Sequence, residues 1–358
     1  MLYSVSSVLP FAVCLMWTVS LGLDMLIYKR TEMQRRALFV LAAVCALLYL
    51  CHAVHFLMNP GFSIWDCIYT FCTLAVYPLF YWHICTLTQE RPDRRGLLIL
   101  LLPSAVASIW ALATFVAGGQ GGTVRLVTGL AVPLEVLAVC VLGMRRLMEF
   151  KYKVENFYAD VEGKTLVTVQ ALLVVFVVIS MASAVASLIG RDAFFDSKLL
   201  ALPSFLFSAL LFTLFYLCSR IGFSVADIPA EPASQNVQEP AAESPDLLFA
   251  RIEALMEQKQ IFRNQGLKIT DVAAAVGSNR TYVSNSINRC AGKSFSDYVH
   301  FYRIRYAKVL MLLGREGEPE TLEAVAEKAG YQSGNSFYRA FVKFEGKSPS
   351  EWLKAHRP

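Results

Sequence analysis

The chain has 358 residues, of which 56% are hydrophobic and 17% are charged, and its net charge is +5. Soluble domains carry about 25% charged residues, so this composition excludes a chain made only of soluble globular domains and favours residence in a membrane. Ionisable residues are sparse between residues 8 and 219 and frequent from residue 246 onward. We therefore predict two parts of different character.

The first part contains long apolar segments. A membrane-spanning helix needs about 20 mostly apolar residues, because it crosses about 30 Å of hydrocarbon at 1.5 Å per residue. Seven segments meet this requirement, at residues 8–27, 37–57, 62–88, 97–117, 124–147, 166–189 and 199–218. The sequence therefore predicts a seven-helix transmembrane domain over residues 1–222.

The basic residues of the predicted loops indicate the orientation of this domain. The loops after the first, third and fifth spans hold twelve Lys and Arg residues, whereas the opposite loops hold three. Cytoplasmic loops retain positive charge. We therefore predict a multi-pass protein of a bacterial inner (cytoplasmic) membrane, with its N-terminus outside and its C-terminal domain in the cytoplasm.

Ionisable side chains within a span are costly and are candidates for function. His52 and His55 are three residues apart on one face of the second span, Asp66 lies at the outer end of the third, and Glu135 lies near the middle of the fifth. We predict that these four residues line an outward-facing pocket that senses a ligand, a metal or protons. The alternative is that they lie at headgroup depth or make interhelical hydrogen bonds.

Residues 223–246 are rich in Pro, Ala, Glu and Ser and contain acidic residues without a basic one. Such a composition predicts a disordered linker. A disordered linker transmits no rigid rotation. A signal from the membrane would then act through proximity or dimerisation.

The part after the linker, residues 247–358, begins with a predicted amphipathic helix and continues with two short helices across a turn. Apolar residues recur at helical spacing, Gly277 permits the left-handed turn, and Thr270 is the predicted N-cap of the first short helix. The predicted buried positions are Val272, Ala273 and Val276 in the first helix and Val283 and Ile287 in the second. This is the pattern of a helix-turn-helix, whose second helix enters the major groove of DNA.

The same pattern recurs near the C-terminus. Val325, Ala326 and Ala329 form the first apolar stripe, Gly330 makes the turn, and Phe337 and Phe341 anchor the second helix. Residues 295–313 lie between the two units and are periodic over one long helix of about 28 Å, which is near the ~34 Å repeat of one DNA turn. The two recognition helices are therefore predicted to enter successive major grooves.

The exposed sides of the two recognition helices carry amide, hydroxyl and basic side chains, which suit base edges and phosphates. Basic residues outnumber acidic ones by six over residues 247–358, which favours the phosphate backbone. The residues predicted to contact DNA are Asn279, Arg280, Thr281, Ser284, Asn285, Asn288, Ser333, Asn335, Ser336, Arg339 and Lys343.

Together the two units resemble the DNA-binding domain of the AraC/XylS family of transcription regulators, over about residues 247–353. The matching residues are Tyr282, Ser284, Gly292, Phe295, Tyr298, Arg303 and Ala307 in the first unit, and Gly330, Tyr331, Ser333, Phe337, Arg339, Phe341, Gly346, Ser348 and Pro349 in the second. The resemblance adds Arg303 to the predicted DNA contacts. Val342 and Leu353 stand where the family has basic residues, and Ile287 replaces an aromatic residue.

We therefore predict an all-α membrane-bound regulator that binds specific double-stranded DNA and senses a signal through its membrane helices. Alternatively, the spans only localise the regulator or bind a partner membrane protein. A transporter or membrane enzyme fused to a regulatory domain is the third reading, but the sequence lacks HExxH, a phosphate loop and paired acids within a span. No enzyme activity, metal or cofactor is predicted. The bilayer, RNA polymerase, an unidentified ligand and a second copy of the chain are the further candidate partners.

Overall fold

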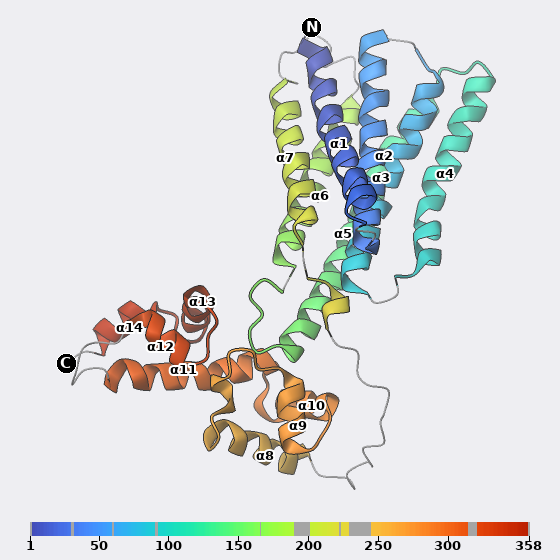
Figure 1. Ribbon diagram of the computed structural model, residues 1–358. Coiled ribbons are helices and arrows are strands. Elements are labelled where there is room, and N and C mark those ends of the chain that lie inside the picture. Colours follow the sequence, from blue (N-terminus) through green and yellow to red (C-terminus); the bar gives the residue numbers. More distant parts are fainter. Residues whose placement is uncertain are drawn as a thin grey trace. The chain divides into compact units, whose positions relative to one another are not determined.

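The computed structural model describes residues 2–29, 32–58, 61–89, 92–164, 166–189, 201–221, 223–228, 245–313 and 321–356. The described residues form fourteen α-helices and no strand, which confirms the predicted all-α class (Figure 1). The predicted linker falls mainly on residues 229–244, which lie outside the described residues. So do Arg30, Arg91, Arg191 and Lys198, which contributed to the count of basic loop residues.

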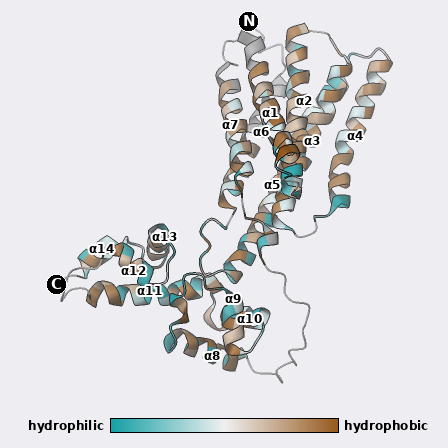
Figure 2. Ribbon diagram, viewed as in Figure 1, coloured by the Kyte–Doolittle hydropathy of each residue, from teal (hydrophilic) through white to brown (hydrophobic). Residues whose placement is uncertain are grey.

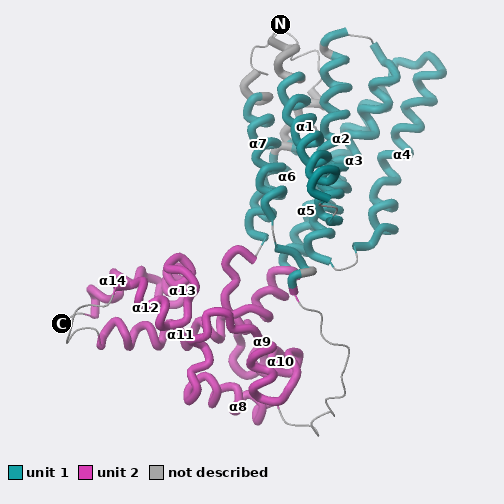
Figure 3. The backbone as a smooth tube through the Cα atoms, viewed as in Figure 1, with its two compact units in different colours: residues 1–148, 166–227 teal, residues 149–165, 228–358 magenta. Residues whose placement is uncertain are grey.

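The chain divides into two compact units, which Figure 3 shows in different colours. Unit 1 comprises Met1–Met148 and Leu166–Asp227, and unit 2 comprises Glu149–Thr165 and Ile228–Pro358. The C-terminal unit thus contains a short segment from the middle of the sequence.

Unit 1 has helices at all seven positions where the sequence predicts spans. They are α1 (Leu2–Ile27), α2 (Met33–Met58), α3 (Ile64–Thr88), α4 (Arg94–Val116), α5 (Gly122–Phe157), α6 (Val167–Ile189) and α7 (Ala201–Ser219). The first five are long and apolar enough to cross a membrane, and the described apolar parts of the last two are Val167–Val178 and Phe205–Ser219. Consecutive helices from α1 to α4 pack against one another, and α7 packs against α1, α2 and α6.

Helix α5 continues for ten residues beyond the C-terminal end of its predicted span at residue 147. A hydrophobicity criterion ends a span at the last apolar residue, whereas a helix can continue through charged residues. The added turns bury Phe150, Val154 and Phe157, which are spaced at helical intervals. Residues 149–157 of α5 belong to unit 2.

Many large apolar side chains on α4 and α5 in unit 1 are exposed. Hydrophobic residues run along the coloured parts of α1–α7 (Figure 2). On α4, Leu98, Ile99 and Ile109 are 64–67% exposed, and Leu134 on α5 is 72% exposed. An apolar surface of this extent is rare on soluble proteins and marks contact with a partner or a membrane.

Unit 2 is built from seven further helices, among which the predicted helix at residues 295–313 appears with the same bounds. They are α8 (Pro245–Glu257), α9 (Ile269–Val276), α10 (Arg280–Ala291), α11 (Phe295–Leu313), α12 (Leu322–Lys328), α13 (Gly334–Glu345) and α14 (Pro349–Ala355). Helices α8, α9 and α10 pack together, α12 and α13 pack together, and α11 contacts α10, α12 and α13. Helix α11 therefore joins two small helical bodies.

Candidate nucleic-acid interface

Helices α9 and α10 form the first helix-turn-helix. Gly277 ends α9 in the left-handed conformation (φ 63°), and the Asn279 side chain caps α10 by accepting a hydrogen bond from the backbone N–H of Tyr282 (2.9 Å). The predicted cap at Thr270 was wrong: the N-cap of α9 is Lys268, whose backbone N–H donates to the Asp271 carboxylate (2.8 Å). The five predicted apolar positions of this unit are all buried.

Helices α12 and α13 form the second helix-turn-helix. The Ser333 hydroxyl caps α13 by accepting from the backbone N–H of Ser336 (3.0 Å). Phe337 and Phe341 are 2% and 0% exposed and pack on one another edge to face, with ring centroids 5.6 Å apart. Buried aromatic rings therefore fix the orientation of α13, as the sequence predicted.

Gly330 is the position in this turn that admits no side chain. Its φ is +91°, and an added Cβ would lie 2.7 Å from the carbonyl oxygens of Phe262 and Arg263. Gly330→Ala should therefore destabilise unit 2 by about 2 kcal/mol or more, because it combines backbone strain with a backbone clash. Urea-dependent hydrogen exchange of α12 and α13 amides in the full chain measures this change.

Gly334→Ala is the matched control for that substitution, since nothing lies within 4 Å of a Cβ at Gly334 and it begins α13. Equal protection in the two variants would contradict the assignment of Gly330 as a required glycine.

The predicted DNA contacts on α10 lie on one side of the helix. Thr281 and Asn285 are exposed, while Arg280, Ser284 and Asn288 are half-buried. The half-buried three have partners on the described segment 149–164: the Ser284 hydroxyl and the Asn288 amide lie 3.4 Å from Asn156 Oδ1, and the Arg280 guanidinium lies 5.8 Å from the centroid of the Phe157 ring.

The predicted contacts on α13 divide in the same way. Asn335, Arg339 and Lys343 are exposed, whereas Ser336 is buried. The Ser336 hydroxyl donates to Asp160 Oδ1 (3.0 Å), and the Ser333 hydroxyl donates to Glu162 Oε2 (2.5 Å). Sequence patterns did not identify residues 149–164 as part of this surface.

Arg303 does not lie on the surface with the other predicted DNA contacts. It is 0% exposed, and its guanidinium donates to the backbone carbonyls of Phe262 and Asn264 (both 2.7 Å). Burial lowers the pKa of Arg303 to about 10. A guanidinium held in this way would have to leave the core to reach a phosphate, so we remove Arg303 from the DNA-contacting set and assign it a structural role.

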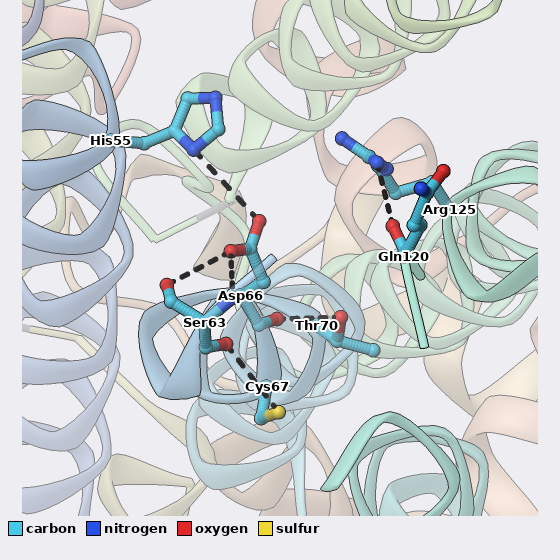
Figure 4. A network of polar contacts seen from close by, with 7 residues as sticks. All are labelled: His55, Ser63, Asp66, Cys67, Thr70, Gln120 and Arg125. Carbon is cyan, nitrogen blue, oxygen red and sulfur yellow. Dashed lines mark hydrogen bonds and ion pairs between the residues drawn. The ribbon is translucent and has the colours of Figure 1, made fainter. Parts of the chain in front are cut away.

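The structure brings two of the four predicted sensor residues together (Figure 4). His55 Nδ1 lies 3.9 Å from Asp66 Oδ1, and the other Asp66 oxygen accepts from the backbone N–H and hydroxyl of Ser63 (both 3.0 Å). The centroid of the His52 ring lies 6.1 Å from the centroid of the Tyr69 ring. Asp66 therefore also has a structural role, as part of the capping box that begins α3.

Glu135 is half-buried on α5, and no described residue forms a hydrogen bond with its Oε2 atom. Among the described residues, no group of three His, Cys, Asp or Glu side chains is arranged to hold a metal ion.

Comparison with known proteins yields a family-model match and partial similarity to individual proteins. Residues 262–355 match the family model described as "Helix-turn-helix domain". The chain is 29% identical over 91 residues to the melibiose operon regulatory proteins of Escherichia coli strains K12 and O6:H1, which covers 25% of this chain. It spans 29% of the length of these relatives. A solved Listeria innocua protein of unknown function is 26% identical, with a TM-score of 0.25, and the match covers 29% of this chain and 95% of that one.

Proposed function

Because the C-terminal third of this chain is an AraC-type helix-turn-helix domain, we propose that the chain is a membrane-bound transcription regulator that binds specific DNA sequences. The observation that carries the proposal is the pair of capped helices, α10 and α13, each presenting amide, hydroxyl and arginine side chains on one side. Such side chains read base edges and phosphates in the major groove. RNA polymerase is the proposed partner in regulation.

Three observations support membrane residence as part of this proposal. Five helices of unit 1 are long and apolar enough to cross a bilayer, and many large apolar side chains on α4 and α5 are exposed. Basic residues concentrate in alternate loops. Under the positive-inside rule this pattern directs the C-terminal domain to the cytoplasm, where it has access to DNA.

The membrane helices have two proposed roles. In the first they sense a signal through the polar residues near the outer ends of α2 and α3, which the 3.9 Å approach of His55 and Asp66 supports. In the second they only localise the regulator. A reporter driven by a captured target promoter distinguishes them: if Asp66→Asn leaves every change of output with growth condition intact, the anchoring role is favoured.

The DNA-binding assignment predicts the effect of removing one arginine from each recognition helix. Arg280→Ala and Arg339→Ala should each weaken binding of the full chain to its target about tenfold, because a direct arginine contact contributes about 1–3 kcal/mol. In the ion pair of Arg339 with Glu162 the charged atoms lie 3.9 Å apart, and the Arg339 side chain is 76% exposed. Such a pair is weak, so its loss changes the DNA affinity of Arg339→Ala little. Chromatin capture supplies the target, and gel-shift titration at fixed salt measures the affinity.

Arg305→Ala is the matched control, since it removes the same charge from a side chain on α11 that pairs with Glu257 on α8 (3.2 Å). If all three variants bind the target as tightly as the wild type does, the assigned recognition surface is wrong.

A further inference from the structure

Residues 149–164 contact the side of α10 that is proposed to face DNA. Asn156 Oδ1 lies 3.4 Å from the Ser284 hydroxyl and 3.4 Å from the Asn288 amide, and the Tyr152 hydroxyl lies 3.4 Å from the same amide. The Asn288 amide is one of the groups suited to pair with adenine. These contacts occupy hydrogen-bonding groups that a base edge would need.

The same segment also reaches the N-terminal part of α13. Asp160 and Glu162 accept hydrogen bonds from the hydroxyls of Ser336 (3.0 Å) and Ser333 (2.5 Å), and Glu162 also pairs with Arg339 (3.9 Å). Two acidic residues thus lie against the hydroxyls and the arginine of the second recognition helix.

Backbone bonds and burial hold the segment between these two contact regions. Ala159 N–H donates to the Leu267 carbonyl (3.1 Å), and the Ala159 carbonyl accepts from the Ser296 hydroxyl (2.9 Å). Tyr158 forms an antiparallel bridge with Lys268. Ala159 and Asp160 are 0% and 4% exposed. The segment is therefore docked on this unit and is not an open surface loop.

The chemistry of the α13 contacts is that of phosphate binding. Serine hydroxyls, an arginine and a helix N-terminus are the groups that bind DNA phosphates. In this structure the carboxylates of Asp160 and Glu162 accept from these two hydroxyls, and Glu162 also pairs with this arginine. A carboxylate and a phosphate cannot fill the same site, so docking of the segment and binding of DNA through Ser333, Ser336 and Arg339 exclude one another.

We propose that residues 149–164 are an intramolecular ligand of the DNA-binding surface and compete with DNA for both recognition helices. This inference rests on the proposed DNA-binding function. The segment consists of the last turns of α5 and the residues that follow it toward α6. A change in these helices that withdraws the segment therefore frees the DNA-binding surface, while covalent attachment keeps the segment's effective concentration high.

Full chain in lipid nanodiscs and a fluorescent 40-base-pair duplex of random sequence test the competition, because phosphate contacts alone support non-specific binding. Asp160→Ala/Glu162→Ala should bind the duplex about tenfold more tightly than the wild type, as expected if about nine in ten wild-type molecules are docked and unable to bind. Equal affinity of the double variant and the wild type would overturn the competition.

Glu155→Ala is the matched control for Glu162→Ala, because it removes the same charge from the same segment and Glu155 pairs with Lys151 (3.7 Å) on that segment. Removing one negative charge reduces the electrostatic repulsion between the chain and DNA by the same amount in both variants. The single Glu162 variant should therefore bind more tightly than the Glu155 variant, whose affinity should change less than about twofold. Equal gains in the two variants would mean that charge alone explains the effect and would overturn the proposal.

Hydrogen exchange of the wild-type chain tests the same competition without a substitution. Saturating duplex should speed exchange of the Ala159 amide severalfold, because its bond to Leu267 breaks when the segment leaves. Unchanged protection of Ala159 in the bound complex would overturn the proposal.

Arg339→Ala separates this proposal from the function on which it rests. If Arg339→Ala weakens binding while Asp160→Ala/Glu162→Ala, the release variant, binds no more tightly than the wild type, the chain binds DNA and the competition is wrong. If neither the wild type nor the release variant binds any duplex, the DNA-binding function fails, and the competition fails with it.

Discussion

Replacing Arg303 with alanine should lower the free energy of unfolding of the helix-turn-helix domain by about 4 kcal/mol. The guanidinium is fully buried and donates to the carbonyls of Phe262 and Asn264. Truncation leaves the buried Phe262 carbonyl without this donor, which costs about 1–3 kcal/mol. It also removes a charge-assisted hydrogen bond to the Asn264 carbonyl, which contributes about 1.5–3 kcal/mol, although that carbonyl still accepts from the backbone N–H of Leu267 (3.2 Å). It also removes the cation that lies 5.3 Å from the centre of the Tyr331 ring. The two helix-turn-helix units would lose the side chain that ties α11 to the loop before α9.

Arg305→Ala on the same helix is the matched control. The Arg305 side chain is 58% exposed and its ion pair with Glu257 is open to solvent, so its removal should change stability by less than about 1 kcal/mol. Urea-dependent hydrogen exchange of α11 amides in the full chain compares the two variants. If both lose the same protection, Arg303 is not the structural residue described above.

The position of Arg303 could have been corrected from the sequence. It follows Val299 by four residues, and Val299 belongs to the apolar stripe of the long helix, so residue 303 lies on the buried face. The prediction that Arg303 contacts DNA rested instead on the resemblance to a DNA-binding family and on the positive charge of the side chain. A basic residue on an apolar face is better assigned to buried backbone carbonyls than to phosphates.

Local sequence patterns predicted the structure correctly where a single feature, such as a glycine or an apolar repeat, determined it. Glycine at residues 277 and 330 marked both turns, and apolar periodicity gave the bounds of α11. The extension of α5 was missed because a hydrophobicity criterion stops at charged residues. The apolar residues at positions 150, 154 and 157 continued the helical period through that charged stretch.

The docking of residues 149–164 could not be predicted from these patterns. Asp160 and Ser336 are 176 positions apart, and both belong to residue types that are ordinary in exposed loops. Periodicity carries no information about which loop packs on which helix. The carboxylates of Asp160 and Glu162 contact the α13 serines only in the folded unit 2.

This docked segment changes the expected route of a signal. The predicted flexible linker, most of it outside the described residues, suggested transfer by proximity or dimerisation. Competition by residues 149–164 would add a second route, in which the helices of unit 1 act through the end of α5 and the residues that follow it. This route requires no rigid linker, because the regulated quantity is the fraction of molecules with a free DNA-binding surface.

Acidification should destabilise the helix-turn-helix domain through His300, whose pKa is lowered to about 4 by burial and, to a smaller extent, by Arg303. Its ring stacks on Tyr331, and Nδ1 lies 3.2 Å from the Tyr331 hydroxyl. Of the other charged groups that act on it, Lys343 lowers the pKa, while Asp160 and Asp297 raise it.

Between pH 6.5 and about 4 the unfolded chain takes up a proton at His300 that the folded chain does not. Stability is therefore full above pH 6.5 and falls by about 3 kcal/mol as the pH drops to 4.

His300→Asn removes this titration while its side-chain amide can still bond to the Tyr331 hydroxyl. Carboxylates that titrate in the same range contribute equally to both proteins, so the difference between them isolates His300. Urea-dependent hydrogen exchange of α11 amides at pH 7 and pH 4, corrected for the intrinsic exchange rate, should show a loss about 3 kcal/mol smaller in the variant. If the two proteins lose the same stability over this range, His300 is not held neutral in the folded domain, and the close packing of His300, Tyr331 and Arg303 does not exclude the proton.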